Sequence, residues 1–345
     1  MADLTQHSSM SLTDRLDQEA LNAMAPSQAD LMRELGVKPR PGWTSKLPSG
    51  LAAFVTNPKG MAGVVILLAL VLFSVFGPMM SDYNPNRRAG KPHVLPSYEH
   101  VLGTTRMGKD VFTQLAYGGR VSLAVGFGAG FAAAAIGLAL GISAGYFGGR
   151  VDDIITFFVN VVLVLPGLPL IIVIATMVEQ ASPMVIGLVL ALTGWGWAAR
   201  TIRTQTLSLR TREFVLSAEL MGEKKWRIIL VEIFPNMLSF VMGGFVLGTI
   251  AAILAEAALE FIGLGDPNAV TWGTMLFWAQ NNLALQSGAW WEIWPPCIAI
   301  MLTGAALVLV NFAVDEITNP QLKASRKIGL IRKFLQRRGR SADVF

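Results

Sequence analysis

Two carboxylates inside an apolar run are the residues best placed for chemistry in this chain of 345 residues. Glu256 and Glu260 stand four residues apart in the stretch ILAEAALEFIGLG, so a helix would carry both on one face. Carboxylates inside a membrane segment are costly and commonly mark a pathway for solutes or protons. Alternatively, the pair lies at the outer end of the run and reaches the interface, as charged side chains at helix ends do. The sequence leaves both interpretations open.

No motif for catalysis or for energy supply accompanies these acids. The sequence has no GxxxxGK[ST] phosphate loop and no HExxH metal signature. His7, His93 and His100 lie outside the apolar runs, and the single cysteine, Cys297, allows no disulfide within the chain. We therefore expect no enzyme, no metal site and no cofactor in this chain, and any energy for transport must come from elsewhere.

Composition indicates a membrane protein. Hydrophobic residues make up 53% of the chain and charged residues 15%, with a mean hydropathy of +0.51, whereas soluble domains have about 25% charged residues. A helix needs roughly 20 apolar residues to cross the hydrocarbon. We predict an all-α integral membrane protein with six transmembrane helices, because the runs do not alternate as barrel strands do. The six runs are residues 60–81, 121–149, 154–178, 181–199, 233–255 and 293–314.

The distribution of Lys and Arg predicts the orientation. Of the 28 basic residues, 22 lie in the segments that an even number of spans places on one side with both termini. The positive-inside rule makes that side the cytoplasm. The other six lie in the long segment between Asp82 and Arg120. The net charge of +5 needs no nucleic acid to explain it, because a cytoplasmic face opposite anionic lipid suffices.

Small residues and prolines predict the packing of two runs. Residues 121–149 carry small residues at four-residue spacing, which lets helix backbones approach closely in lipid and predicts a helix buried among others. These small residues are Gly126, Gly130, Ala134, Gly137, Gly141 and Gly145. In residues 154–178, Pro166 and Pro169 of LPGLPL are expected to kink the helix. The kink forms either an angled wall around a pathway or a purely architectural bend.

The polar N-terminal segment, residues 1–59, is predicted to be a cytoplasmic extension and not a secretory signal peptide, because its first apolar run starts late. Apolar residues at every fourth position form either a short amphipathic helix or a flexible tail. They are Leu12, Leu16, Ala20 and Met24.

The connection at residues 200–239 is longer than a bilayer crossing requires. Its centre, EFVLSAELMGEKKWRIILVEIFPNML, is predicted to be helical, with Gly222 as a helix end because glycine adopts the left-handed conformation cheaply. Pro235 stops or kinks a second helix where the chain re-enters the membrane. Ala218 and Gly222 form a small-residue face that suits docking into a groove of a partner; a helix lying on lipid headgroups explains them equally well.

This loop resembles the EAA loop of bacterial ABC importer permeases. The motif residues occur in order as Ala218, Gly222, Ile233 and Pro235, while Leu216 and Ser217 stand where the motif has Glu and Ala. VLGTTRMGKDVFTQLAYGGRVSL is similar to the signature of the C-type subunit of the dipeptide/oligopeptide/nickel permeases, with Thr105 and Lys109 replacing Asp and Arg. GISAGYFGGRVDDII, ILAEAALEFIGLG, WGTML and NFAVDEITNPQL also match, so the resemblance covers residues 60–322.

The resemblance implies a type I ABC importer permease bundle in the bacterial cytoplasmic (inner) membrane, with both termini cytoplasmic. A homologous B-type permease subunit would complete the solute pathway. Two ATPase subunits, which use ATP and Mg, would bind on the cytoplasmic side, and a solute-binding protein would dock outside. ATPase closure would move a coupling helix, residues 217–223, as a rigid body.

The resemblance also assigns residues to ATPase coupling: Leu216, Ser217, Ala218, Glu219, Leu220, Met221, Gly222, Glu223, Ile233 and Pro235. Our candidates for the pathway or its gate are Pro166, Pro169, Glu256 and Glu260.

We expect four segments in the chain. They are the extension (1–59), the first transmembrane helix with its outer loop (60–120), the core permease domain (121–322) with the coupling loop at 200–239, and a basic tail (323–345). Di- or oligopeptides are the expected substrates, with oligosaccharides or a nickel chelate as alternatives in the same architecture. A channel or carrier without an ATPase, and a membrane-embedded enzyme, are the competing classes.

Overall fold

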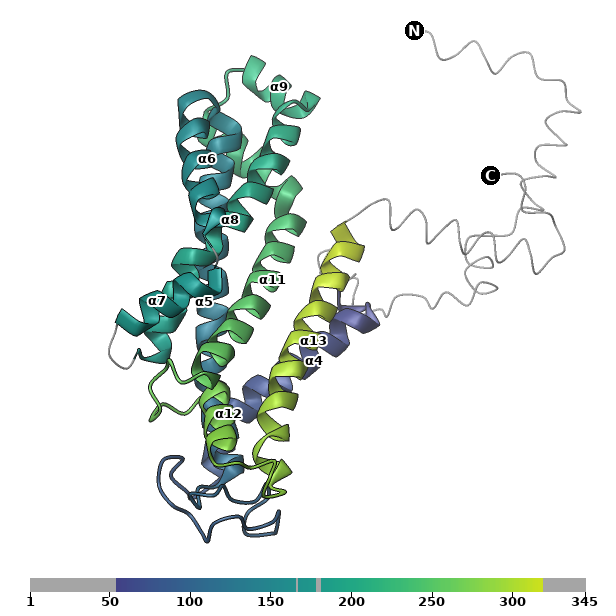
Figure 1. Ribbon diagram of the computed structural model, residues 1–345. Helices are drawn as coiled ribbons and strands as arrows, with labels where there is room; N and C mark the ends of the chain where they lie inside the picture. The colour runs from purple at the N-terminus through teal and green to yellow at the C-terminus, as the bar shows by residue number, and fades with distance from the viewer. Residues whose placement is uncertain (1–53, 166, 178–180, 319–345) are drawn as a thin grey trace, which may run out of the picture. The chain divides into compact units, whose positions relative to one another are not determined.

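The computed structural model of the protein describes residues 54–165, 167–177 and 181–318 (Figure 1). Residues 1–53, the basic tail and Pro166 lie outside the described residues. Every element in the described ranges is a helix. They are α4 (Pro58–Phe76), η2 (Gly77–Met80), α5 (Val111–Phe147), α6 (Gly149–Val164), α7 (Gly167–Met177), α8 (Pro183–Arg210), α9 (Glu213–Leu220), α10 (Lys225–Arg227), η3 (Ile228–Ile233), α11 (Phe234–Phe261), α12 (Trp272–Asn281), η4 (Trp290–Glu292) and α13 (Trp294–Thr318).

Five helical segments in these ranges are long and apolar enough to cross a membrane. They correspond to five of the six predicted runs, and the all-helical prediction is confirmed. The five segments are Pro58–Met80, Val111–Phe147, Pro183–Arg210, Lys225–Phe261 and Trp290–Glu316.

The remaining run, residues 154–178, does not form the single kinked helix that we predicted. α6 ends at Val164, and Leu165 adopts an extended conformation with φ −68° and ψ 128°. α7 then begins at Gly167 and has 11 residues, so neither helix alone has the roughly 20 residues of a complete span. The residue before a proline is disfavoured in the helical region, which explains an extended Leu165. Pro169 lies in the first turn of α7, where a missing N–H breaks no helical hydrogen bond.

The glycine-rich helix α5 lies at the centre of the helices, packed on α8 and α11, as the small residues predicted (Figure 1). A Cβ on Gly137 would lie 2.6 Å from Ala198 Cβ of α8, and one on Gly141 would lie 2.7 Å from the Ala199 carbonyl oxygen. Gly126 approaches Ile253 of α11 in the same way. The glycines therefore set the distances between α5 and its two neighbours.

A folded loop, residues 81–110, connects η2 to α5, and we refer to it as the 81–110 loop. Asp110 Oδ1 accepts a hydrogen bond of 2.8 Å from Thr113 N and so caps α5. Its other carboxylate oxygen pairs with His100 Nδ1 at 2.9 Å, and both side chains are buried. This pair ties the loop to the start of α5.

Two spanning helices extend beyond their apolar runs into the predicted coupling loop. α8 continues to Arg210, and the helical segment that contains α11 begins at Lys225. α9 lies between them at one end of the bundle, and α12 lies at the opposite end (Figure 1). The two ends of the Lys225–Phe261 segment therefore carry the two candidate sites.

Candidate functional site

α9 is held to the bundle by its own apolar side chains. Val215 and Ala218, three residues apart, are 0% and 5% exposed and pack in one cluster with Ile142 of α5 and Ile202 of α8. Full burial of a valine contributes roughly 1.5–3 kcal/mol. α9 is therefore packed directly against α5 and α8.

The end of α9 has the geometry that Gly222 predicted. Gly222 has φ +76°, its N–H donates to the Glu219 carbonyl at 3.0 Å, and Glu223 N–H donates to the Ala218 carbonyl at 3.1 Å. These two bonds form a Schellman motif, which satisfies the last carbonyls of the helix. The helix spans Glu213–Leu220 instead of the expected 217–223, because this motif ends it before Gly222.

α9 exposes apolar side chains among its polar ones, and they do not lie on the face that we predicted. Ala218 points into the protein, so the interpretation of Ala218 and Gly222 as one outward docking face is wrong. Leu216, Leu220 and Met221 are 46%, 89% and 75% exposed, and we refer to them as the α9 apolar patch. Such a patch at a helix end is typical of a surface that contacts another protein or a membrane.

Polar contacts orient α9 and the turn after it. Tyr146 at the end of α5 donates a hydrogen bond of 3.1 Å from its hydroxyl to Glu219 Oε1. Arg227 Nη1 pairs with Glu223, four residues away. Among the predicted coupling residues, Ser217 is exposed and bonded only through its backbone.

The re-entry to the long helix passes through one π-helical segment, η3. Pro235 follows it in the first turn of α11, and Phe234 N–H donates to the Ile229 carbonyl, five residues back. A proline lacks an N–H and its ring crowds the carbonyl four residues earlier, so a wider turn accommodates it. Ile233 is fully buried in the cluster that holds α9. Pro235 therefore widens the helix without stopping it.

The carboxylate pair lies buried at the other end of the same helix. Glu256 and Glu260 are 0% and 1% exposed, so in this conformation neither side chain reaches the aqueous interface. Ser122 Oγ of α5 donates to Glu256 Oε1 at 3.1 Å and accepts a bond of 3.2 Å from Trp272 N. Ser122 therefore joins α5, α11 and α12 at one point.

Glu260 holds the loop before α12. Thr271 donates from its hydroxyl to Glu260 Oε2, and Thr271 and Thr274 cap α12 reciprocally, each hydroxyl accepting a backbone bond of 3.0 Å from the other residue. A Cβ on Gly273 would lie 2.6 Å from Glu260 Oε2, so only glycine leaves room for the carboxylate. Glu256 Oε2 and Glu260 Oε1 have no hydrogen-bond partner among the described residues.

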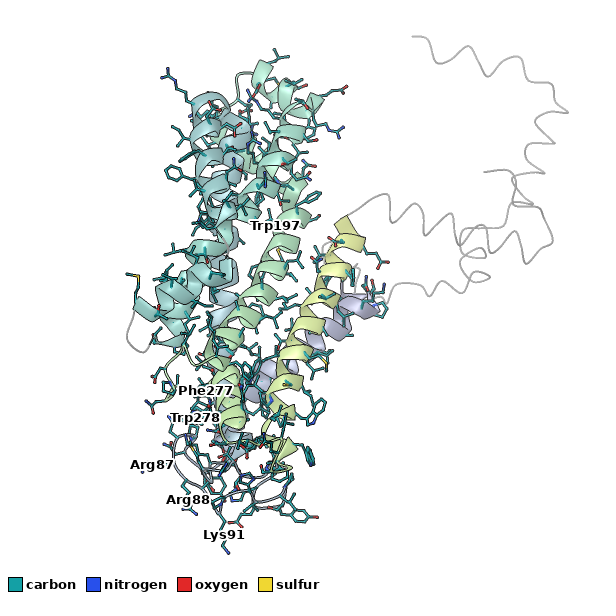
Figure 2. All side chains as sticks on the ribbon, in the orientation of Figure 1. Arg87, Arg88, Lys91, Trp197, Phe277 and Trp278 are labelled. Carbon is teal, nitrogen blue, oxygen red and sulfur yellow. The ribbon has the colours of Figure 1, made fainter. Side chains whose placement is uncertain are left out.

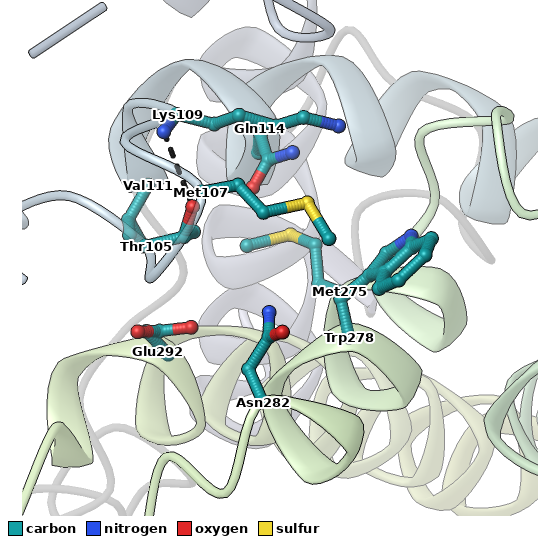
Figure 3. Close-up of a pocket in the computed structure, with 9 residues that line it drawn as sticks. All are labelled: Thr105, Met107, Lys109, Val111, Gln114, Met275, Trp278, Asn282 and Glu292. Atoms are coloured by element: carbon teal, nitrogen blue, oxygen red, sulfur yellow. Dashed lines mark hydrogen bonds between the residues drawn. The ribbon is translucent and has the colours of Figure 1, made fainter. Parts of the chain in front are cut away.

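Two hollows lie near this end. An apolar cavity of about 750 Å³ is lined by α11, α12 and α13, including Leu254, Phe261 and Ile300, but not by either carboxylate. A second cavity, of about 10 Å³, is close to the smallest that holds one water. Figure 3 shows Thr105 and Lys109 on one side of it and Trp278 on another; Lys109 N donates to Thr105 Oγ1 at 3.1 Å.

Several residues of these sites were missed by the sequence reasoning. Val215 precedes Ala218 by three residues, a helical spacing that marks a buried face. The threonine pair Thr271 and Thr274 before an apolar stretch has the spacing of a helix cap. Ser122 and Tyr146 carried no local signal, because their partners are distant in the sequence.

Comparison of the sequence with known protein families identifies this helical chain as a transport permease. Residues 137–324 match the profile of the family described as binding-protein-dependent transport system inner membrane component, and the chain belongs to that family. Residues 50–95 match the profile described as the N-terminal TM domain of oligopeptide transport permease C. The protein is thus a multi-pass membrane permease, which confirms the family resemblance.

Named relatives resemble most of the chain. The dipeptide transport system permease protein DppC of Bacillus subtilis (strain 168) is 35% identical over 272 residues, which cover 77% of this chain and 83% of the relative. The oligopeptide transport system permease protein OppC of the same organism is 30% identical, over 78% of this chain and 88% of the relative. OppC of Mycobacterium tuberculosis (strain ATCC 25618 / H37Rv) is 31% identical, over 80% and 94%.

Proposed function

We propose that this protein is the C-type permease subunit of an ATP-driven importer of di- or oligopeptides in the bacterial inner membrane. With a B-type permease it forms the solute pathway through the membrane. Both termini and α9 face the cytoplasm, and the 81–110 loop and α12 face outside. The names of the relatives support peptides over the oligosaccharides and nickel chelates that the same architecture would also accept.

The α9 apolar patch is the observation that carries this proposal. The patch leaves its apolar side chains uncovered, while Val215 and Ala218 fasten α9 to α5 and α8. An ATPase subunit that covers the patch would move α9 together with the helices to which it is fastened. In a channel or carrier without an ATPase, only a membrane surface would cover this patch, and ATPase co-purification distinguishes the two cases.

The carboxylate pair is proposed as part of the outer gate. Ser122 and Thr271 connect Glu256 and Glu260 to α5 and to the cap of α12. A movement of α11 that starts at α9 would therefore be transmitted to α12 at the outer end. We retain the four predicted segments, residues 1–59, 60–120, 121–322 and 323–345, within this proposal. We also retain Pro169 as part of the wall around the solute pathway.

Reconstitution of the whole transporter tests this function. The permease pair, the ATPases and the solute-binding protein are assembled in proteoliposomes, and ATP-dependent uptake is measured for dipeptides, oligopeptides, an oligosaccharide and a nickel chelate. We expect peptide uptake. Equal uptake without ATP, or uptake of the other solutes alone, would contradict the proposal.

Leu220→Arg tests the ATPase contact in the same system. Leu220 is almost fully exposed, so the change leaves the fold intact and disrupts only a covered surface. We expect loss of ATPase co-purification and of uptake. Leu95→Arg is the matched control for ATPase co-purification alone, because Leu95 is also exposed but lies on the 81–110 loop, at the end of the bundle opposite α9.

A further inference from the structure

Three basic residues stand together on the 81–110 loop. Arg87, Arg88 and Lys91 are all exposed and lie within five positions of the chain. Figure 2 shows them beyond the helix ends, at the end of the bundle that carries α12. We refer to these three residues as the basic arm.

The basic arm is held in place by the rest of its loop. Ala89 and Gly90 both donate backbone hydrogen bonds to the Gly108 carbonyl, at 2.7 and 3.0 Å. Asn86 Nδ2 donates at 3.2 Å to the carbonyl of Asn268, in the connection between α11 and α12. The positive charges are therefore presented by an ordered backbone, which lowers the entropy cost of binding a partner.

The charges of the arm are not neutralised within the described part of the chain. No ion pair found there includes Arg87, Arg88 or Lys91. Arg88 uses its Nε to donate to the Gly90 carbonyl at 2.9 Å, which leaves both terminal nitrogens available. The same loop carries three acids, Asp82, Glu99 and Asp110; the buried Asp110 is paired with His100, and among the described residues none of the three forms an ion pair with the arm.

The position of the arm runs against the usual charge bias of membrane proteins. The arm begins seven residues after Met80, the end of the first spanning segment. Lys and Arg within about 15–20 residues of a span favour the cytoplasmic side, yet the proposed orientation places this loop outside. Membrane insertion therefore does not explain these positive charges. Binding of an anionic partner explains them.

We propose that the basic arm docks an acidic surface of the solute-binding protein on which this transporter family depends. The inference rests on the proposed function, which places the loop outside. Arg87, Arg88 and Lys91 provide the charged rim, and the exposed Leu95 and Val101 of the same loop provide apolar contact, as in other interfaces. A protein suits the arm better than lipid headgroups because the arm projects beyond the helix ends (Figure 2).

The test measures docking of the purified solute-binding protein to the complete transporter in nanodiscs of neutral phosphatidylcholine. The variant is Arg87→Glu/Lys91→Glu, because neither side chain holds the fold. We expect the dissociation constant to rise at least about tenfold at low salt, mainly through a slower association rate. High salt should weaken docking of the unaltered complex and change the variant little.

The matched control is Arg150→Glu/Arg200→Glu, which reverses two exposed charges elsewhere in the bundle and should leave docking unchanged. An unchanged dissociation constant in the loop variant overturns the proposal. So does a defect that appears only in nanodiscs with anionic lipid, or reduced uptake with unchanged docking, which would assign the arm to lipid or to substrate. ATP-dependent uptake by the unaltered complex is recorded in parallel, and failure there counts against the proposed function instead.

Discussion

The two ends of the Lys225–Phe261 segment depart in opposite ways from the usual distribution of side chains. At the α9 end, Leu220 and Met221 are exposed. At the α12 end, Glu256 and Glu260 are buried. Exposed apolar side chains are covered by another protein or by lipid, whereas buried carboxylates need internal hydrogen bonds. We propose that another protein covers the α9 end, whereas at the α12 end the chain itself binds one oxygen of each carboxylate.

Among the variants that test this difference between the two ends, Glu260→Ala should lower the free energy of unfolding most. The change removes the acceptor of the Thr271 hydroxyl and leaves a cavity under Gly273. We expect a loss of about 3 kcal/mol in the free energy of unfolding, measured by denaturation of the purified complex in detergent. Glu260→Gln keeps the volume and an acceptor oxygen and should lose much less. Equal losses for both variants would show that ionisation of the carboxyl matters more than its position.

Ser122→Ala should have the next largest effect. Removal of the hydroxyl leaves Glu256 Oε1 and Trp272 N without a partner in a buried site. An unsatisfied buried group costs about 1–3 kcal/mol, and the same denaturation experiment detects it. Ser287→Ala is the control, because that hydroxyl is exposed and bonds only to nearby backbone carbonyls. If Ser122→Ala leaves the free energy of unfolding unchanged, Ser122 does not contribute a stabilising link between α5, α11 and α12.

Gly222→Ala tests the α9 end through the backbone alone. A Cβ there would meet nothing within 4 Å, so only the left-handed conformation opposes it. We expect destabilisation of about 1 kcal/mol and a reduced number of peptides imported per ATP hydrolysed. Gly222→Asn should be milder, since asparagine tolerates this conformation. If Asn is as damaging as Ala, the side chain itself interferes with the partner.

Tyr146→Phe should have the smallest effect. It removes one hydrogen bond, to the exposed Glu219. Because water replaces that bond, we expect a loss of about 0.5 kcal/mol and nearly normal uptake. Glu219→Gln, which keeps an acceptor, is the control. An effect as large as that of Ser122→Ala would show that internal hydrogen bonds also stabilise the α9 end. That result would contradict the proposed difference between the two ends.

Local patterns in the sequence predicted what local physics controls. Charge-free runs predicted five of the spanning segments, because apolar length alone decides whether a helix can cross a bilayer. Gly222 predicted a helix end, because only backbone conformation is involved. The glycines of α5 predicted close packing, though not which neighbour each would meet.

Side-chain direction at the two candidate sites was not predictable in the same way. Ala218 was assigned outward and lies inward, because its neighbours Ile142 and Ile202 come from distant helices. The alternative that Glu256 reaches the interface is wrong for a similar reason. Glu256 is buried where Ser122 joins it to Trp272, and both residues are distant from Glu256 in the sequence or lie on another helix.

The sequence by itself determined that this chain crosses a membrane, belongs to a permease family and carries a helix ending at Gly222. These properties follow from composition, residue order and backbone preference. Only the tertiary structure decided that α9 exposes Leu216, Leu220 and Met221 and that the two carboxylates are internal. The physical reason is that burial depends on which distant helices pack together, and no local pattern specifies those partners.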